Sequence, residues 1–117
     1  MAKKIMIVDD DPAIVTYLET FFEDNGYDTC AASDGTEATK LIKQEKPDLI
    51  TLDLDMPKEW GPRFYRKYTK NPELKNIPVI VISGMPTNQY AIKNALATLS
   101  KPFDRDELLK IVKDAIG

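Results

Sequence analysis

Three aspartates in this sequence stand at the ends of apolar runs that have the composition of buried strands. Asp9 and Asp10 follow the run at Lys4–Val8, and Asp53 follows a run that ends at Leu52. Carboxylates that lie close together repel one another, so at least one would take up a proton unless a cation joins them. Oxygen ligands with room left for water suit Mg²⁺, which usually shares its shell with phosphate. The pattern therefore predicts a magnesium site where these acids meet.

Ser83 and Lys101 also follow apolar runs, in the second half of the chain. A lysine supplies a fixed positive charge, and a hydroxyl supplies a hydrogen-bond donor. Together with a carboxylate and a metal ion, these groups can capture a phosphoryl group. In this interpretation Asp53 is the nucleophile that forms an aspartyl phosphate, while Asp10 and Asp53 hold the metal with help from Asp9.

The elements that must position these residues are βα units around a parallel sheet, because short runs rich in Ile and Val alternate with stretches of helical spacing. The strands are predicted at Lys4–Val8, Tyr27–Ala31, Asp48–Leu52, Pro78–Ile82 and Ala97–Leu99. The helices are predicted from Asp11-Pro12 to Asn25-Gly26, from Ser33-Asp34 to the residue before Pro47, from Gly61-Pro62 through Tyr68, at Asn88–Lys93, and from Asp104 through Ile116. Ligands of open α/β sheets bind beyond the carboxyl ends of the strands. In a sheet of order 2-1-3-4-5, the first, third and fourth strands are neighbours, which brings the acids together.

Composition excludes several classes of function. The chain has 117 residues, which suits one domain over residues 1–117, and its net charge of -3 argues against a nucleic-acid surface. The N-terminal MAKKIMIVDD is neither a signal peptide nor a membrane span, so we expect a cytoplasmic protein without membrane contact. Because Cys30 is the single cysteine, the chain cannot form an internal disulfide. We expect Cys30 to be a small residue of the core. The absence of histidine excludes Ser-His and Cys-His catalysis, His-ligated metals and the role of a phosphohistidine carrier.

These motifs, in this order, resemble those of the receiver domain of two-component response regulators. The matching segments are VDDDP at 8–12, LDLDMP at 52–57 with a glycine at 61, VISG at 81–84 and KPF at 101–103. The resemblance implies a doubly wound, flavodoxin-like α/β fold with five parallel strands. The functional positions of the family fall on the acid pocket Asp9, Asp10 and Asp53, on the metal-binding backbone carbonyl of Asp55, on Ser83, and on Lys101 ahead of a cis Pro102.

The resemblance also implies a mode of action. A sensor histidine kinase or a phosphotransfer protein would donate the phosphoryl group, and the charge gained by Asp53 would draw Ser83 and Lys101 inward. That movement would shift an equilibrium between two conformations of a distal face that binds other proteins. The chain would then be no enzyme beyond its own phosphotransfer and dephosphorylation, and we expect a monomer or a weak homodimer.

The sequence departs from the family's pattern at three places. Thr98 stands where the family usually has Tyr or Phe, an aromatic that swings between exposed and buried positions. The segment between Ser83 and Lys101 is short, which predicts a shortened fourth helix. Asp55 and Met85 occupy positions that influence how fast the family loses its phosphoryl group, so we expect an altered lifetime.

Two other functions are compatible with these residues. Asp53-Leu54-Asp55 matches the D-x-D of haloacid dehalogenase-like phosphatases, although in that family the motif lies on the first strand. A receiver-like scaffold that binds partners without being phosphorylated is favoured by Thr98 and by the shortened helix. Such a scaffold would bind its partner equally well after Asp53→Asn, whereas a switch would lose the difference between its two states.

Overall fold

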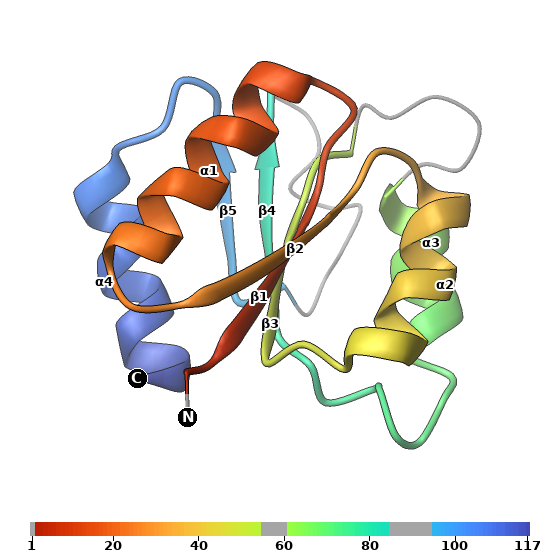
Figure 1. Cartoon of the computed structure of the whole chain (residues 1–117). Helices are drawn as coiled ribbons and strands as arrows, with labels where there is room; N and C mark the ends of the chain where they lie inside the picture. Colours follow the sequence, from red (N-terminus) through yellow and green to blue (C-terminus); the bar gives the residue numbers. More distant parts are fainter. Residues whose placement is uncertain (1, 55–60, 85–94) are drawn as a thin grey trace.

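Five parallel strands form one sheet through the middle of the protein (Figure 1). The structure is a computed structural model that describes residues 2–54, 61–84 and 95–117. The strands are β1 Lys4–Val8, β2 Asp28–Ala32, β3 Leu49–Leu52, β4 Val79–Ser83 and β5 Ala97–Ser100. Their order is β2-β1-β3-β4-β5 and every neighbouring pair is parallel, which confirms the predicted order 2-1-3-4-5.

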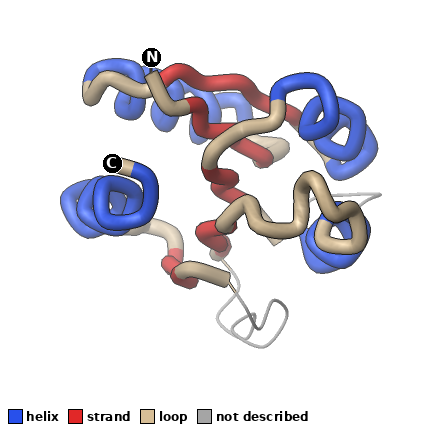
Figure 2. The backbone as a smooth tube through the Cα atoms, turned by 90° about the horizontal axis from the view of Figure 1, so that it is seen from below, coloured by secondary structure: helices blue, strands red, loops and turns tan. Residues whose placement is uncertain are grey.

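Helices cover both faces of the sheet. Those of the described residues are α1 Pro12–Asp24, α2 Gly35–Glu45, α3 Gly61–Tyr68 and α4 Arg105–Ile116. One face is covered by α1 and α4 and the other by α2 and α3 (Figures 1 and 2). The helix predicted at Asn88–Lys93, together with its shortening, lies outside the described residues. Within the described ranges, no helix is long and apolar enough to cross a membrane.

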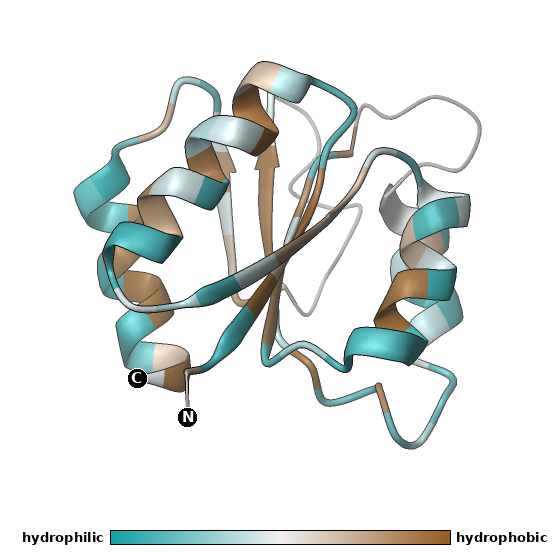
Figure 3. Ribbon diagram, viewed as in Figure 1, coloured by the Kyte–Doolittle hydropathy of each residue, from teal (hydrophilic) through white to brown (hydrophobic). Residues whose placement is uncertain are grey.

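The core has two apolar layers, because successive side chains of a strand point to opposite faces of the sheet. The layer on the α1 and α4 side includes Ile5, Ile7, Phe22 and Leu108. The layer on the α2 and α3 side includes Met6, Val8, Ile42 and Phe64. Figure 3 shows the helices with apolar surface toward the sheet and polar surface away from it. Burial on both faces explains why the central strands consist mainly of apolar residues.

Acidic caps determine where three of the helices begin. Asp11, Asp34 and Asp104 are the N-caps of α1, α2 and α4, and their side chains accept hydrogen bonds from backbone N–H groups of the first turns. Such a cap contributes about 1 kcal/mol. Two of these helices therefore start within a few residues of the ends of β1 and β5, where the predicted functional residues lie.

The observed boundaries differ from the predicted ones by a residue at several places. β2 begins one residue later than predicted, because the Tyr27 N–H donates to the Phe22 carbonyl at 3.0 Å and so closes the end of α1. Gly26, with φ of 91°, makes the turn that this bond requires. β4 and β5 each extend one residue further than predicted, since Ser83 pairs in register with Ser100.

Candidate functional site

The register of the sheet brings the ends of β1 and β3 side by side. Val8 is paired with Leu52, so Asp9 and Asp53 follow at the same level. The Asp53 N–H donates to the Val8 carbonyl at 2.9 Å, and the Asp9 N–H donates to the Ala32 carbonyl at 3.1 Å. These bonds extend the sheet one residue beyond the strands, so both carboxylates project from a well-held backbone.

Asp9, Asp10 and Asp53 form a carboxylate cluster at the carboxyl ends of these strands. Each offers one oxygen, and these oxygens all lie within 4.8 Å of one another. Asp9 and Asp53 are each only 3% exposed, whereas Asp10 is exposed. The structure therefore brings together the three acids singled out in the sequence, and leaves the cluster open to solvent at Asp10.

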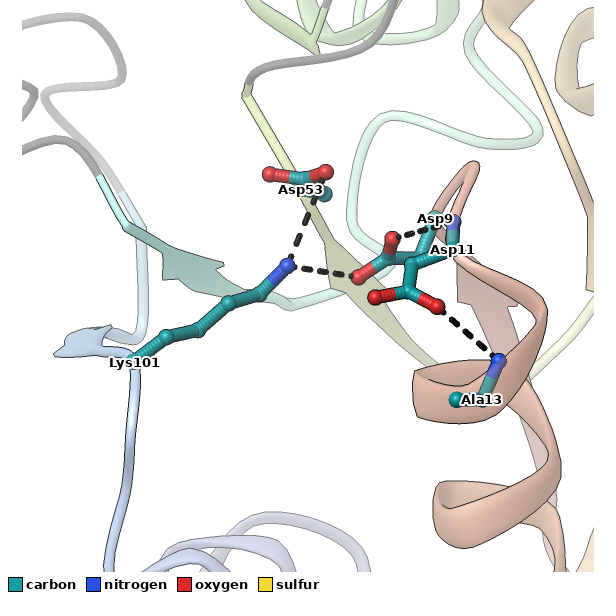
Figure 4. A network of polar contacts seen from close by, with 5 residues as sticks. All are labelled: Asp9, Asp11, Ala13, Asp53 and Lys101. Carbon is teal, nitrogen blue, oxygen red and sulfur yellow. Dashed lines mark hydrogen bonds and ion pairs between the residues drawn. The ribbon is translucent and has the colours of Figure 1, made fainter.

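Lys101 brings a positive charge into the carboxylate cluster (Figure 4). Its Nζ lies 2.9 Å from Asp9 Oδ2 and 3.7 Å from Asp53 Oδ2. The Lys101 N–H donates to the Ser83 carbonyl at 3.0 Å, which ties the start of this loop to β4. The peptide bond between Lys101 and Pro102 is cis, as the resemblance implied. A cation in this position offsets the repulsion between two buried carboxylates.

The start of α1 holds Asp9 from the other side (Figure 4). Asp9 Oδ1 accepts a hydrogen bond of 2.9 Å from the Asp11 N–H. Asp11 Oδ1 in turn accepts one of 2.9 Å from the Ala13 N–H, as the cap of the helix. One oxygen of Asp9 thus binds the helix start while the other binds Lys101, so two contacts determine where this carboxylate lies.

The other residues singled out in the sequence are described only in part. Ser83 is the last residue of β4 and is buried. Thr98 lies on β5 and is exposed, so a small polar side chain occupies the position of the family's aromatic. Asp55 and Met85 lie outside the described residues. The predicted roles of these four positions stay predictions.

A cavity of about 250 Å³ opens beside the carboxylate cluster, between α1 and the start of α2. Asp9 and Asp10 line one part of it, and Ser33 and Glu37 line another. Glu37 N–H donates to Asp34 Oδ1, and Glu37 Oε1 accepts a hydrogen bond of 2.8 Å from the Ser33 N–H, which is a variant of the capping box shifted to the residue before the cap. In the sequence Glu37 carries only the spacing of this box. Its place beside the acids depends on how α2 packs.

The ligand atoms of the carboxylate cluster suit a hard divalent cation. They are all carboxylate oxygens, and among the described residues the three acids outnumber the single lysine, Lys101, that pairs with them. The exposed position of Asp10 leaves room for water in the shell. Mg²⁺ prefers such a partly hydrated set of oxygen ligands. The arrangement can therefore hold a divalent cation next to the buried carboxylate of Asp53.

The chain is similar in sequence and in fold to known proteins. The family model described as the response regulator receiver domain matches residues 5–113. Protein Rrf1 of Nitratidesulfovibrio vulgaris is 36% identical over 117 residues, which cover 100% of this chain and 85% of that protein. Two further curated relatives are longer, and the chain spans about half of their length.

Two solved structures show the same fold. The chemotaxis protein CheY4 of Vibrio cholerae is 27% identical, with a TM-score of 0.90 over 99% of this chain and 100% of that one. The receiver domain of a sensor histidine kinase from Pseudomonas aeruginosa PAO1 is 24% identical, with a TM-score of 0.90 over 100% of this chain and 99% of that one. The latter was crystallised with a magnesium ion coordinated in its active site cleft.

Proposed function

Because the chain belongs to the family of response regulator receiver domains, we propose that residues 1–117 form a phosphorylation-dependent switch of a two-component system, with Asp53 as the phosphoryl acceptor. Receiver domains are signalling domains and not classical enzymes. The geometry of the carboxylate cluster carries the proposal. Buried Asp53 has an oxygen within 4.8 Å of oxygens of Asp9 and Asp10, and lies 3.7 Å from Lys101 Nζ.

The proposed reaction transfers a phosphoryl group to the carboxylate of Asp53. An oxygen of Asp53 attacks the phosphorus of the donor, the bond from phosphorus to the donor's nitrogen or oxygen breaks, and the leaving group takes up a proton from water. By the pattern of the family, the donor is a phosphohistidine of a sensor histidine kinase or of a phosphotransfer protein. Hydrolysis later returns the carboxylate and releases inorganic phosphate. The surrounding residues contribute positioning and charge stabilisation.

Mg²⁺ is the cofactor that suits the residues around Asp53. Asp9, Asp10 and Asp53 would hold it through carboxylate oxygens, and by the family's pattern the backbone carbonyl of Asp55 would join them. When bound, the ion neutralises negative charge on the carboxylates and on the phosphoryl oxygens. The all-oxygen ligand set of this chain supports the assignment.

Lys101 and Ser83 are the residues that would respond to phosphorylation. In the unphosphorylated protein, Lys101 Nζ lies closer to Asp9 than to Asp53, at 2.9 Å against 3.7 Å. A phosphoryl group adds negative charge and acceptor oxygens next to Lys101. The ammonium group would therefore move from Asp9 toward those oxygens, and the Ser83 hydroxyl would donate to another of them. Lys101 belongs to the loop between β5 and α4, so its movement would shift this loop. The shift would favour a second conformation of the face that binds other proteins.

Intact mass spectrometry after incubation with a small acyl phosphate tests this function. We expect the wild-type protein to gain the mass of one phosphoryl group when Mg²⁺ is present and not when it is removed. Asp53→Asn should gain nothing under either condition. Asp114→Asn is the matched control, because Asp114 is an exposed aspartate of α4 that pairs with Lys110, and it should behave as wild type.

Two outcomes would contradict the proposal. A gain of mass in Asp53→Asn would place the acceptor on another residue. No gain by the wild-type protein under any condition would favour the phosphorylation-independent scaffold, whose partner binding Asp53→Asn would leave unchanged. The haloacid dehalogenase-like alternative is not supported, because the matched family is the receiver domain and Asp53 follows β3, not the first strand.

A further inference from the structure

A groove of about 270 Å³ lies between α2 and α3. Its lining includes three buried residues, Ile42, Tyr68 and Leu74. It also includes three exposed lysines, Lys43, Lys67 and Lys70. We call this feature the lysine groove. It joins an apolar floor to a positively charged rim, a combination that the receiver function does not use.

The lysine groove lies near the amino-terminal ends of the strands, whereas Asp53 lies at their carboxyl ends. A helix that connects two parallel strands runs back along the sheet, so its last turn lies near the amino-terminal ends of the strands. The groove is lined by the later residues of α2 and α3 and by the segment that leads to β4. Figure 1 shows α2 and α3 side by side on the face opposite α1 and α4. The groove is therefore spatially separate from the carboxylate cluster.

The two segments that form this groove carry a net positive charge, although the chain as a whole is acidic. Residues 35–46 and 61–76 together contain eight Lys and Arg against three Glu and no Asp, in a chain of net charge -3. In the part of the chain that the structure describes, neither Lys43, Lys67 nor Lys70 forms an ion pair with a carboxylate. A clustered positive charge of this kind attracts anionic partners and speeds their encounter.

The lysine groove is at the small end of ligand-binding sites. Small-molecule sites usually enclose roughly 300–1,000 Å³, and this groove has about 270 Å³. In protein interfaces, by contrast, a single apolar or aromatic anchor commonly fills a small pocket whose rim is polar. The apolar floor formed by Ile42, Tyr68 and Leu74 provides such a pocket.

We propose that the lysine groove binds an acidic segment of another protein. One apolar or aromatic side chain of that segment enters between α2 and α3, and carboxylates on either side of it lie next to Lys43, Lys67 and Lys70. The positive rim selects the charge of the segment, and the apolar floor selects its anchor. A nucleic acid fits less well, because a phosphate backbone has no counterpart to that floor and the protein is acidic overall.

Fluorescence anisotropy with a labelled peptide tests the charge of the rim. The probe is a short fluorescein-labelled peptide of Glu and Ser with one central Phe. We expect it to bind the wild-type protein at low salt and to bind at least about tenfold more weakly at high salt, where exposed charges are screened. The triple variant Lys43→Glu, Lys67→Glu and Lys70→Glu should weaken binding by at least about tenfold. The control with the same net charge reverses Lys3, Lys110 and Lys113 to Glu, which are exposed outside the groove, and should bind as wild type.

A second pair of variants tests the pocket itself without changing charge. Thr39 lines the groove, so Thr39→Phe fills it and should remove the advantage of the Phe-containing peptide over the same peptide with Ser in place of Phe. Thr20→Phe, at an exposed position of α1, should leave that advantage unchanged. Thermal unfolding shows whether each variant is folded. Asp53→Asn should bind the peptide as wild type, which separates this surface from the phosphorylation switch.

Three results would overturn the proposal. The first is no measurable binding of the peptide to the wild-type protein. The second is binding that neither the charge reversal in the groove nor Thr39→Phe alters. The third is tighter binding of a single-stranded oligonucleotide of similar charge, which would make this face a nucleic-acid surface.

Discussion

Lys101 makes two unequal contacts with buried carboxylates. Its Nζ is 2.9 Å from Asp9 and 3.7 Å from Asp53, and Asp9 is also held by the Asp11 N–H. The shorter contact is the stronger one, since the Coulomb energy falls with distance. Replacement of Asp53 by Asn should therefore leave the main ion pair intact. This makes Asp53→Asn a variant that removes the proposed acceptor while the fold is kept.

Cys30 gives a test of burial at the scale of one residue. Burial, assisted by the Glu45 carboxylate, raises the pKa of the Cys30 thiol to about 11 from an ordinary value of 9.0. The thiolate is the nucleophile that attacks alkylating reagents. Below pH 9 the folded protein should hold roughly a hundredfold less thiolate than the unfolded chain. We expect iodoacetamide to alkylate the native protein far more slowly than the protein in urea, as followed by intact mass at pH 8.

The same pKa shift has a definite sign in stability. Between about pH 9 and pH 11 the unfolded chain loses the proton of Cys30 while the folded protein keeps it. The contribution of Cys30 to stability is therefore fully present below pH 9 and is lost as the pH rises through that range.

Equal alkylation rates for the native and the unfolded protein would contradict both statements. They would show that the Cys30 thiol is accessible and has an ordinary pKa.

At the scale of elements, β3 delivers the proposed acceptor and is buried along its whole length. Thr51 is its one polar residue, paired with Ile7 of β1 and Ile80 of β4. Its hydroxyl oxygen is buried and has no hydrogen-bond partner among the described residues. A buried hydroxyl without a partner costs about 1–3 kcal/mol. The strand that precedes Asp53 therefore contains a buried hydroxyl that lowers its stability and that a substitution can remove.

Thr51→Val should remove that defect, because it replaces the hydroxyl by a methyl group of similar size. We expect the free energy of unfolding in urea to rise by about 1 kcal/mol. Thr51→Ser is the complementary variant: it keeps the hydroxyl and loses the methyl group, so it should lower the free energy of unfolding by about 1 kcal/mol. A destabilised Val variant beside an unchanged Ser variant would mean that the hydroxyl is hydrogen-bonded after all.

At the scale of the whole molecule, negative charge gathers at the carboxyl ends of the strands and positive charge near their amino-terminal ends. The carboxylate cluster follows β1 and β3 at the carboxyl ends of the strands, and Lys101, directly after β5, pairs with it. The lysine groove lies between α2 and α3, near the amino-terminal ends of the strands. The two proposals therefore concern separate surfaces. Asp53 would receive a phosphoryl group at one end of the strands, while the lysine groove binds a partner at the other end.

Metal binding at the carboxylate cluster should raise the stability of the entire fold. A ligand that binds only the folded state stabilises it by about 2.7 kcal/mol at a hundredfold excess over its Kd. We expect MgCl₂ to raise the midpoint of thermal unfolding by several degrees, and a chelator to reverse the rise. Asp10→Asn should lose most of this effect, because Asp10 is the exposed member of the cluster and its replacement disturbs little packing.

Two controls accompany the melting experiment. NaCl at the same ionic strength should not reproduce the rise, and Asp114→Asn should keep it in full. A rise of equal size in Asp10→Asn would show that Mg²⁺ acts elsewhere on the protein.

The segments that form the sheet, and the residues that follow them, could be predicted from the sequence. The apolar runs before Asp9 and Asp53 predicted buried strands, and the structure confirms both strands and the order of the sheet. These features could be predicted because they depend on neighbours along the chain: apolar composition marks a strand that is covered on both faces, and a residue directly after a strand must lie at its end. The boundary at Tyr27 was missed by one residue, because a hydrogen bond to the end of α1 takes its N–H out of the sheet.

The contacts between residues that are distant in the sequence, and their distances, could not be predicted and depend on the tertiary structure. Lys101 and Asp9 are 92 positions apart in the chain, and the preference of Lys101 for Asp9 over Asp53 appears only once the strands are in register. The lysine groove likewise needs α2 and α3 to pack together, since neither helix forms it alone. Periodicity is a property of a local stretch of sequence, whereas register and side-chain distances depend on the packing of the complete sheet, in which a slip of one residue would turn every side chain of a strand to the other face.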